Sequence, residues 1–142
     1  MKLTIGGLID LEREVWSISP DASVYQALER LASHDIGAII VVEDDKLIGI
    51  MSERDYARKV ELADRSSHET LVRDIMTANP QTVTSNESVD ACMAIMTEGG
   101  FRHLPVVDED GLKGVVSIVD VVRTIVENQA SLIGDLERYI SG

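Results

Sequence analysis

A serine and an aspartate three residues apart occur twice in the chain, each time after a glycine and an apolar run. The two copies are Gly49–Asp55 (GIMSERD) and Gly114–Asp120 (GVVSIVD). The spacing predicts that each serine lies at a strand-to-helix junction and each aspartate on the first helical turn. A hydroxyl beside the N–H groups of a helix N-terminus suits a phosphate. A carboxylate on the same turn can accept from two vicinal hydroxyls, as acidic residues do with a ribose. The pattern therefore predicts a binding site for ribose phosphates.

A purely structural interpretation of the same pattern is also open. Ser-x-x-Asp resembles a capping box, in which the serine oxygen accepts from an early backbone N–H and the acidic side chain reaches back. Such a cap contributes about 1 kcal/mol to stability. The two interpretations are compatible, because one junction can cap a helix and also face a ligand.

The two motifs belong to a tandem repeat with an offset of 65 residues. Trp16–Glu61 aligns with Gln81–Val126 without a gap, and ten pairs are identical, including both serines and both aspartates of the motifs. A repeat of this length predicts architecture more strongly than any single motif does. We expect two related sites, facing each other across a pseudo-two-fold axis.

Each repeat is expected to run strand, helix, strand, strand, helix in a mixed α/β fold. Apolar residues at helical spacing and two short apolar runs carry the prediction. In the first repeat the expected elements are an extended Val15–Ser19, a helix through Val24, Ala27, Leu28 and Leu31, strands Ala38–Val42 and Leu47–Met51, and a helix from Glu53 to about Leu62. In the second they are Gln81–Thr84, a helix through Val89, Cys92, Met93 and Met96, strands His103–Val107 and Leu112–Val116, and a helix after Ser117.

Five segments follow from this pattern. They are an N-terminal helical segment (1–14), the first repeat (15–62), a linker (63–80), the second repeat (81–126) and a C-terminal helix extension (127–142). Within the linker, Val72, Ile75 and Met76 form one apolar helical turn. The apolar stripe of the last helix continues to Ile140, and we expect it to dock on Leu8, Ile9 and Leu11 or on another subunit.

Composition excludes several classes of function. The formal net charge of −12 disfavours binding to nucleic acid, because a phosphate backbone needs a basic patch. No apolar run approaches the ~20 residues that span a bilayer, and no secretion signal is evident, so we expect a cytoplasmic protein without a membrane partner. Cys92, the single cysteine, aligns with the core position Ala27 and is expected to pack in the core. We expect no bound metal, no catalytic residues and no enzymatic activity, because no metal cluster, Ser–His–Asp set or carboxylate pair is recognisable.

The repeats resemble CBS domains, and the pair resembles a Bateman module of the kind found in small stand-alone bacterial proteins. The resemblance covers roughly Val15–Val126. The repeat, the Gly-x-x-Ser-x-x-Asp units, Val72–Thr77 (VRDIMT) and Arg102–Val107 (RHLPVV) carry it. Ser52–Lys59, Arg65–Ser67 and Leu136–Gly142 resemble the small stand-alone subgroup.

The resemblance implies two clefts between the repeats that bind adenosine ligands such as AMP, ADP, ATP, NAD(H) or S-adenosylmethionine. In such sites Asp55 and Asp120 would hold ribose hydroxyls, and Ser52 and Ser117 would hold phosphate. Backbone and side chains around the first two strands would frame the base. These residues are Ser17, Ile18, Gly37, Ala38 and Ile39 in the first repeat and Thr82, Val83, Arg102, His103 and Leu104 in the second.

The two copies differ in their basic residues, which predicts unequal sites. Arg54 lies inside the first motif, where the second motif has Val119. Arg58 and Lys59 follow the first motif. A phosphate is therefore better supported at the first motif. Arg102 and His103 of the second repeat stand where the first has Gly37 and Ala38, and they could face a cleft from the other repeat.

The expected function is a regulatory adenine-nucleotide-sensing module that signals by conformational change to an effector protein that the sequence does not name. We expect a homodimer, from the resemblance and from the C-terminal apolar stripe. The alternative is a ligand-independent dimerisation or partner-interaction module. The two motif aspartates, Asp55 and Asp120, count against that alternative.

Overall fold

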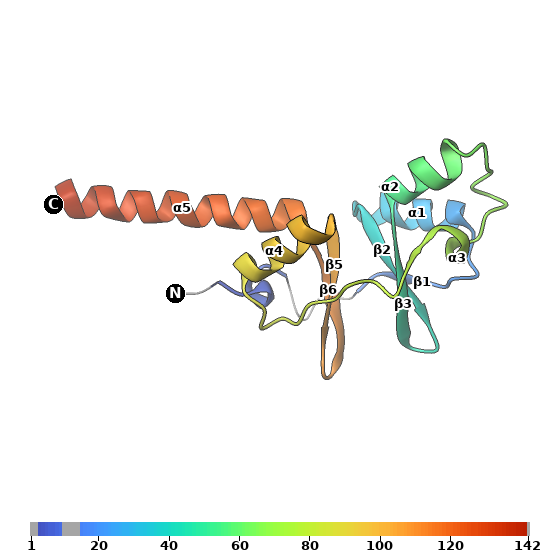
Figure 1. Ribbon diagram of the computed structural model, residues 1–142, viewed down its shortest axis with the longest axis horizontal. Coiled ribbons are helices and arrows are strands. Elements are labelled where there is room, and N and C mark those ends of the chain that lie inside the picture. Colours follow the sequence, from blue (N-terminus) through green and yellow to red (C-terminus); the bar gives the residue numbers. More distant parts are fainter. Residues whose placement is uncertain (1–2, 10–14, 142) are drawn as a thin grey trace. The chain divides into compact units, whose positions relative to one another are not determined.

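The structure is a computed structural model that describes residues 3–9 and 15–141 and forms two compact α/β units (Figure 1). The first-repeat unit comprises residues 15–82. The second-repeat unit combines the N-terminal residues 3–9 with residues 83–141. The mixed α/β fold with two repeats is confirmed. The pseudo-two-fold axis concerns the arrangement of the two units and stays a prediction.

The first-repeat unit is built on a four-stranded sheet in the order β1-β2-β3-β4. β1 is parallel to β2, and the other two pairs are antiparallel. The elements are β1 (Ser17–Ile18), α1 (Val24–His34), β2 (Ala38–Glu43), β3 (Lys46–Ser52), α2 (Glu53–Tyr56), a π-helical turn (Ala57–Glu61), α3 (Val72–Ile75) and β4 (Thr77–Ala78). The expected helix after Ser52 is therefore α-helical for one turn only and then widens.

The second-repeat unit follows the same plan around the antiparallel pair β5–β6. Its elements are a 3₁₀ turn (Ile5–Gly7), α4 (Val89–Gly99), β5 (His103–Asp108), β6 (Gly111–Ser117) and α5 (Ile118–Ser141). The expected strand Gln81–Thr84 is reduced to one parallel bridge between Val83 and Val106. In the first repeat Ile18 pairs with Val41, and both residues lie 65 positions earlier. The two repeats therefore also share the register of this strand pairing.

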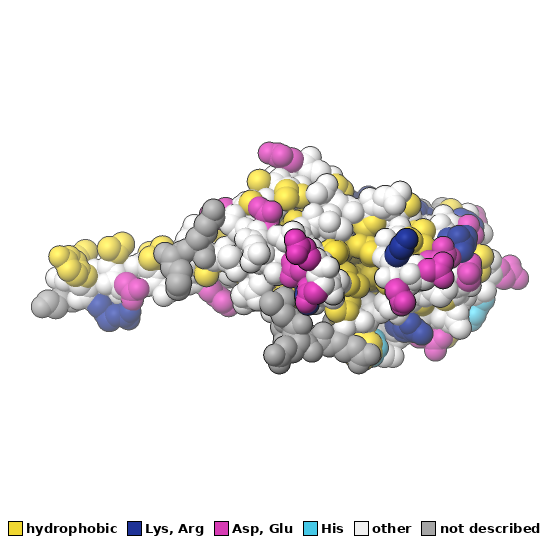
Figure 2. Space-filling model, turned by 90° about the horizontal axis from the view of Figure 1, so that it is seen from below, with side chains coloured by type: hydrophobic (Ala, Val, Ile, Leu, Met, Phe, Trp, Pro, Cys, Tyr) yellow, Lys and Arg dark blue, Asp and Glu magenta, His cyan; other side chains and the backbone are white. Residues whose placement is uncertain are grey.

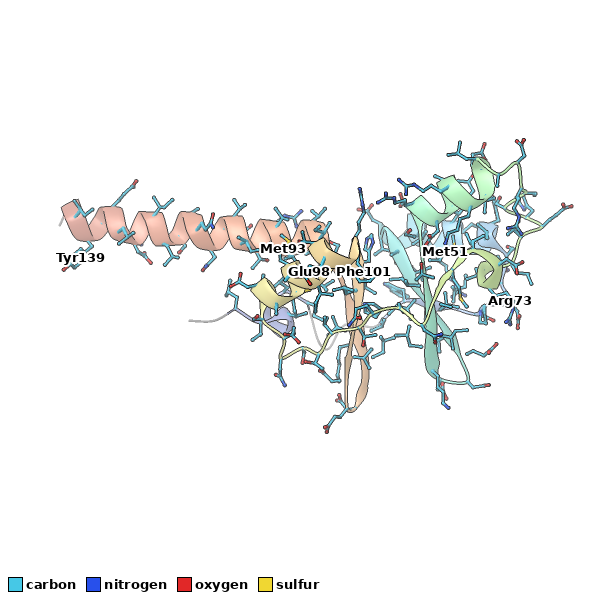
Figure 3. All side chains as sticks on the ribbon, in the orientation of Figure 1. Met51, Arg73, Met93, Glu98, Phe101 and Tyr139 are labelled. Atoms are coloured by element: carbon cyan, nitrogen blue, oxygen red, sulfur yellow. The ribbon has the colours of Figure 1, made fainter. Side chains whose placement is uncertain are left out.

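One face of each sheet carries a hydrophobic core. Ile39, Val41 and Met51 pack with α1 in the first-repeat unit, where Met51 is fully buried (Figure 3). The equivalent Leu104, Val106 and Val116 pack with α4 and the start of α5 in the second. Because side chains alternate along a strand, the neighbouring residues must point to the opposite face. Those residues, Ala38, Ile40 and Ile50, are also at most 9% exposed.

The N-terminal segment completes the second-repeat unit in the way that the linker completes the first. Ile5 and Val72 are both fully buried, one in each core. Their backbone contacts match. Ile5 N–H donates to the Glu87 carbonyl (2.9 Å) and Gly6 N–H to Ser85 (2.8 Å), while Val72 N–H donates to Ala22 (2.9 Å) and Arg73 N–H to Pro20 (3.0 Å). The acceptors in the two sets are 65 residues apart. The second-repeat unit is therefore completed by a segment that precedes the first repeat. The first-repeat unit is completed by a segment that follows the first repeat.

The long last helix belongs to its own unit only at its beginning. Val121 is fully buried, and Ile118 and Ile125 pack partly against the second core together with Leu8 and Ile9. Leu8 and Ile9 of the N-terminal segment thus pack against the same core as the start of α5, while Leu11 lies outside the described residues. From Val126 onward the large apolar residues of α5 are more than half exposed, and Figure 1 shows the helix continuing well past α4.

Candidate functional site

The first motif is a complete capping box at the junction of β3 and α2. The Ser52 hydroxyl accepts from the Asp55 N–H at 3.1 Å. Asp55 Oδ2 accepts in return from the Ser52 backbone N–H at 2.9 Å and from the Ser52 hydroxyl at 3.1 Å. The structural interpretation of this motif is therefore confirmed. Four lone-pair positions on a carboxylate leave Asp55 capacity for further donors.

A lysine holds the other oxygen of the same carboxylate. Lys59 Nζ lies 3.1 Å from Asp55 Oδ1 and donates to the Ile75 carbonyl at 2.8 Å. The Asp55 side chain is only 17% exposed. Lys59 thus fixes the carboxylate and ties the motif to α3. At the position equivalent to Lys59, the second repeat has Thr124.

The second motif is more open. The Ser117 hydroxyl accepts from the Asp120 N–H at 3.1 Å, as in the first repeat. The Asp120 side chain is 44% exposed, and Arg123 Nη1 lies 3.7 Å from its Oδ1. At that distance and exposure an ion pair holds the carboxylate weakly. The two aspartates therefore differ in constraint as well as in neighbouring charge.

Strand register brings the start of the second strand of each repeat to the serine of its own motif. Ala38 pairs with Ser52, and His103 with Ser117. The first N–H of each helix also donates to the residue before that strand. Glu53 N–H donates to the Gly37 carbonyl (3.1 Å) and Ile118 N–H to the Arg102 carbonyl (2.8 Å). The first motif thus lies beside Gly37 and Ala38, and the second beside Arg102 and His103.

The predicted framing residues divide between the two faces of their sheets. Residues directly opposite on paired strands share a face. Ser17, Ala38 and Ser52 share the face opposite the core, through the pairs Ser17–Ile40 and Ala38–Ser52. The same reasoning assigns His103 and Ser117 to the corresponding face of the second unit, and the bridge Val83–Val106 assigns Thr82 to it by alternation. These faces combine hydroxyl groups and an imidazole with a helix N-terminus.

Four other predicted framing residues point into the cores. Ile18, Ile39, Val83 and Leu104 are at most 4% exposed and belong to the two hydrophobic clusters. Their side chains therefore serve packing, which leaves only their backbone for contact with a ligand. Residue spacing alone did not separate these positions from their outward-facing neighbours.

An aromatic pair lies next to the first framing strand. The rings of Trp16 and His34 are stacked, with centroids 3.7 Å apart and planes at 7°. Arg30 donates from its guanidinium to the Ser17 carbonyl. His34 is therefore half-buried in a stack with Trp16. The stack joins the end of α1 to the residue before β1, and the Arg30 contact joins α1 to β1 itself.

Two titrating groups have pKa values set by local contacts. The Ser85 hydroxyl and backbone N–H donate to the Asp108 carboxylate at 2.6 and 2.8 Å and lower the pKa of Asp108. Burial, with a smaller effect of Glu87, raises the pKa of the Cys92 thiol. Cys92 is fully buried, which confirms its expected place in the core. A raised thiol pKa disfavours the reactive thiolate at neutral pH.

Within the described ranges, no three histidine, cysteine or acidic side chains gather in a way that could hold a metal ion. In the same part of the chain, no helix combines the length and the apolarity needed to span a membrane.

Comparison with known proteins identifies the class. The family model of the CBS domain matches residues 8–62 and again 72–127. The chain therefore belongs to the CBS-domain family and carries two copies of the domain. The resemblance inferred from the repeat and its motifs is confirmed.

Particular relatives agree with this assignment. A CBS-domain protein from Burkholderia ambifaria MC40-6 has a solved structure that is 42% identical, with a TM-score of 0.83, covering 89% of this chain and 96% of its own. The mitochondrial CBS-domain protein CBSX3 of Arabidopsis thaliana is 41% identical over 133 residues. The aligned region covers 90% of this chain but only 64% of the length of CBSX3. The Arabidopsis thaliana protein CBSX2, solved in complex with AMP, is 28% identical, with a TM-score of 0.70, covering 89% of this chain and 98% of CBSX2.

One part of the candidate site was not foreseen in its role. Lys59 was recognised only as a basic residue after the motif, whereas the structure ties it to Asp55. The four-residue spacing from Asp55 to Lys59 is the signal that could have found it, because such pairs meet on one helix face.

Proposed function

We propose that this chain is a regulatory module that binds adenine nucleotides through its two Ser–Asp motifs. One observation carries the proposal. In both repeats, strand pairing sets a serine hydroxyl at a helix start beside the first residues of the second strand, with an aspartate on the following turn. The AMP complex of the related protein CBSX2 supports the choice of ligand class.

Within each site the residues have distinct proposed roles. Asp55 and Asp120 accept hydrogen bonds from the ribose hydroxyls, and Ser52 and Ser117 donate to a phosphate oxygen. Ser17 and Thr82 border the adenine through their hydroxyls, and backbone groups of the neighbouring strand residues complete its frame. The ligand itself supplies no catalytic chemistry in this proposal, and AMP, ATP and NAD(H) all present the required ribose phosphate.

The two sites are proposed to be unequal. Asp55 is held by Ser52 and Lys59 and is largely covered, so its geometry is set before a ligand binds. Asp120 is more exposed and less constrained, and must lose more freedom on binding. Arg54 lies inside the first motif, where the second motif has Val119. We therefore expect the first motif to favour a phosphate more strongly.

Signalling follows from a shift between conformations of the module. A ligand shifts such an equilibrium only by its differential affinity for the two states. We propose that the module works as a homodimer and that an effector protein reads the change, without any enzymatic step on this chain.

A thermal-shift panel of AMP, ADP, ATP, NAD⁺ and NADH tests the proposal. A ligand at about 100 times its dissociation constant adds ~2.7 kcal/mol of apparent stability. We expect at least one nucleotide to raise Tm, and Asp55→Ala and Asp120→Ala each to abolish the response at one site. No shift with any member of the panel would favour the ligand-independent assembly module instead. Turnover of a nucleotide would identify an enzyme.

A further inference from the structure

The exposed apolar residues of α5 follow a heptad spacing. Taking every third and fourth residue alternately from Val119 gives one continuous line along the helix. This α5 seam consists of Val119, Val122, Val126, Gln129, Ile133, Leu136 and Ile140. Its six apolar members are between 43% and 82% exposed. A sustained 3-4 alternation over three heptads is the pattern of a helix that pairs with another helix.

The helix projects far enough to pair outside its own unit. Its 24 residues correspond to about 36 Å. Figure 3 shows Tyr139 near the far end of α5, away from α4 and the β5–β6 pair of the same unit. Hydrophobic side chains line the free part of the helix in Figure 2. Leu132 and Tyr139, at 55% and 86% exposure, widen the stripe beside the seam.

We propose that α5 forms a parallel, in-register, two-stranded coiled coil with α5 of a second copy of this chain. The proposal deepens the homodimer of the proposed function, and rests on it, by naming the surface and the orientation. It does not depend on which nucleotide the motifs bind.

The residue types at the a positions of the seam favour two parallel strands. The a positions of the heptad are Val119, Val126, Ile133 and Ile140. All four of these residues are β-branched. β-Branched residues at a, with leucine at d as at Leu136, favour two-stranded parallel coiled coils.

The one polar seam residue supports the in-register pairing. Gln129 occupies a d position between apolar layers. In a parallel pair, Gln129 meets Gln129 of the second copy, and the two amides can donate to and accept from each other. In the antiparallel register with the greatest overlap, Gln129 would face Ile133 of the second copy and bury an amide without a partner. A single polar residue in a seam specifies register in this way.

The charge distribution permits two copies to meet along this face. The chain as a whole has a net charge of −12, but α5 carries only four acidic and two basic residues. Of these six, only Arg123 and Glu137 flank the seam, at e positions. The other four lie on outer positions of the heptad, so repulsion between two acidic chains is smallest at the seam.

Sedimentation equilibrium of the full chain tests the surface. We compare Ile133→Asp, in the seam, with Ser131→Asp, which adds the same charge on the outer face two residues earlier. Ile133→Asp is expected to raise the dimer dissociation constant at least 100-fold, and Ser131→Asp to leave it within about threefold. Gln129→Leu, which keeps the helix and removes the buried amide, is expected to tighten the dimer. Circular dichroism checks helix content, and AMP titration of each variant separates this proposal from nucleotide binding.

Disulfide trapping tests the orientation in a Cys92→Ala background. Val126→Cys is expected to form a disulfide-linked dimer, because equivalent a positions meet in a parallel pair. In the antiparallel register residue 126 would meet residue 136, and two copies of residue 126 would be about 15 Å apart, too far for a disulfide. Linkage only in a mixture of Val126→Cys with Leu136→Cys would overturn the parallel orientation. A monomeric wild-type chain, or a dimer indifferent to Ile133→Asp, would overturn the seam, the latter without contradicting dimerisation.

Discussion

Alanine at the two motif aspartates is predicted to separate folding from ligand binding. Asp55→Ala removes the acceptor for the Ser52 N–H and the partner of Lys59 at a site where the carboxylate is 17% exposed. A lost hydrogen bond of this kind costs about 1 kcal/mol, and the partly covered ion pair adds up to about 1 kcal/mol. The higher helix propensity of alanine returns about 0.5 kcal/mol. We expect a net loss of roughly 0.5–1.5 kcal/mol.

The matched change in the second repeat is predicted to be nearly silent for folding. Asp120 is 44% exposed, and its ion pair with Arg123 spans 3.7 Å between exposed side chains. Such a pair contributes about 0–0.5 kcal/mol, which the propensity of alanine offsets. Asp120→Ala should therefore leave the free energy of unfolding almost unchanged while it removes the ribose acceptor.

Urea unfolding without ligand and AMP titration of the same preparations check this pair of predictions. For a chain of 142 residues, a loss of about 0.5–1.5 kcal/mol lowers Tm by about 2–5 °C. We expect that drop for Asp55→Ala only, and weaker AMP binding for both variants. Equal unfolding costs for the two variants would refute the assigned difference in constraint. Unchanged AMP affinity in both would refute the ribose role.

Three further predictions concern the fold around the sites. Gly49→Ala should destabilise the first-repeat unit by about 1–3 kcal/mol, because its Cβ would lie 2.5 Å from Met76 Sδ and 3.1 Å from the Thr77 carbonyl oxygen. Gly134→Ala, whose Cβ meets nothing closer than 3.9 Å, should stabilise α5 by about 1 kcal/mol, and urea unfolding of the pair tests the contrast. Ser85→Ala should destabilise the protein at neutral pH. Ser85 lowers the pKa of Asp108 below its ordinary value of 3.8, so its contribution is present above that pH and is lost as the pH falls through the lowered folded-state pKa. Unfolding curves from pH 7 to 2 should therefore converge for the two proteins, and a constant gap would contradict the assignment. Cys92 should resist a thiol reagent in the native protein at pH 7.5 and react only on unfolding, because burial raises the pKa of its thiol. Rapid native labelling would contradict that position.

Local patterns predicted the repeated elements because those elements are specified by nearby residues. The i, i+3, i+4, i+7 spacing of Val24, Ala27, Leu28 and Leu31 is realised in α1, with Ser23 as its capping residue. The apolar run from Ala38 predicted β2 because both faces of that strand are buried. Serine at a strand end with aspartate three residues on predicted the helix starts at Ser52 and Ser117.

Features that depend on long-range contacts were not predictable in the same way. The matching contacts of Ile5 and Val72 join segments with little sequence similarity, so only the backbone bonds reveal that they are equivalent. In the π-helical turn after Tyr56, Val60 is buried and Lys59 donates to the Ile75 carbonyl. Residue spacing within one helix does not encode these two contacts. The split of the framing residues between core and outer face required strand register, which apolar runs leave open.

The central claim, that the motif aspartates hold ribose hydroxyls, is tested most directly by calorimetric titration of two ligands into two proteins. AMP and 2′,3′-dideoxy-AMP are compared on the wild-type chain and on Asp120→Ala, whose fold we expect to be intact. The wild type should bind AMP at least tenfold more tightly than the dideoxy ligand at the second site, and Asp120→Ala should lose that preference. Equal affinity of the wild type for the two ligands, or a preference at the second site that survives Asp120→Ala, would contradict the account.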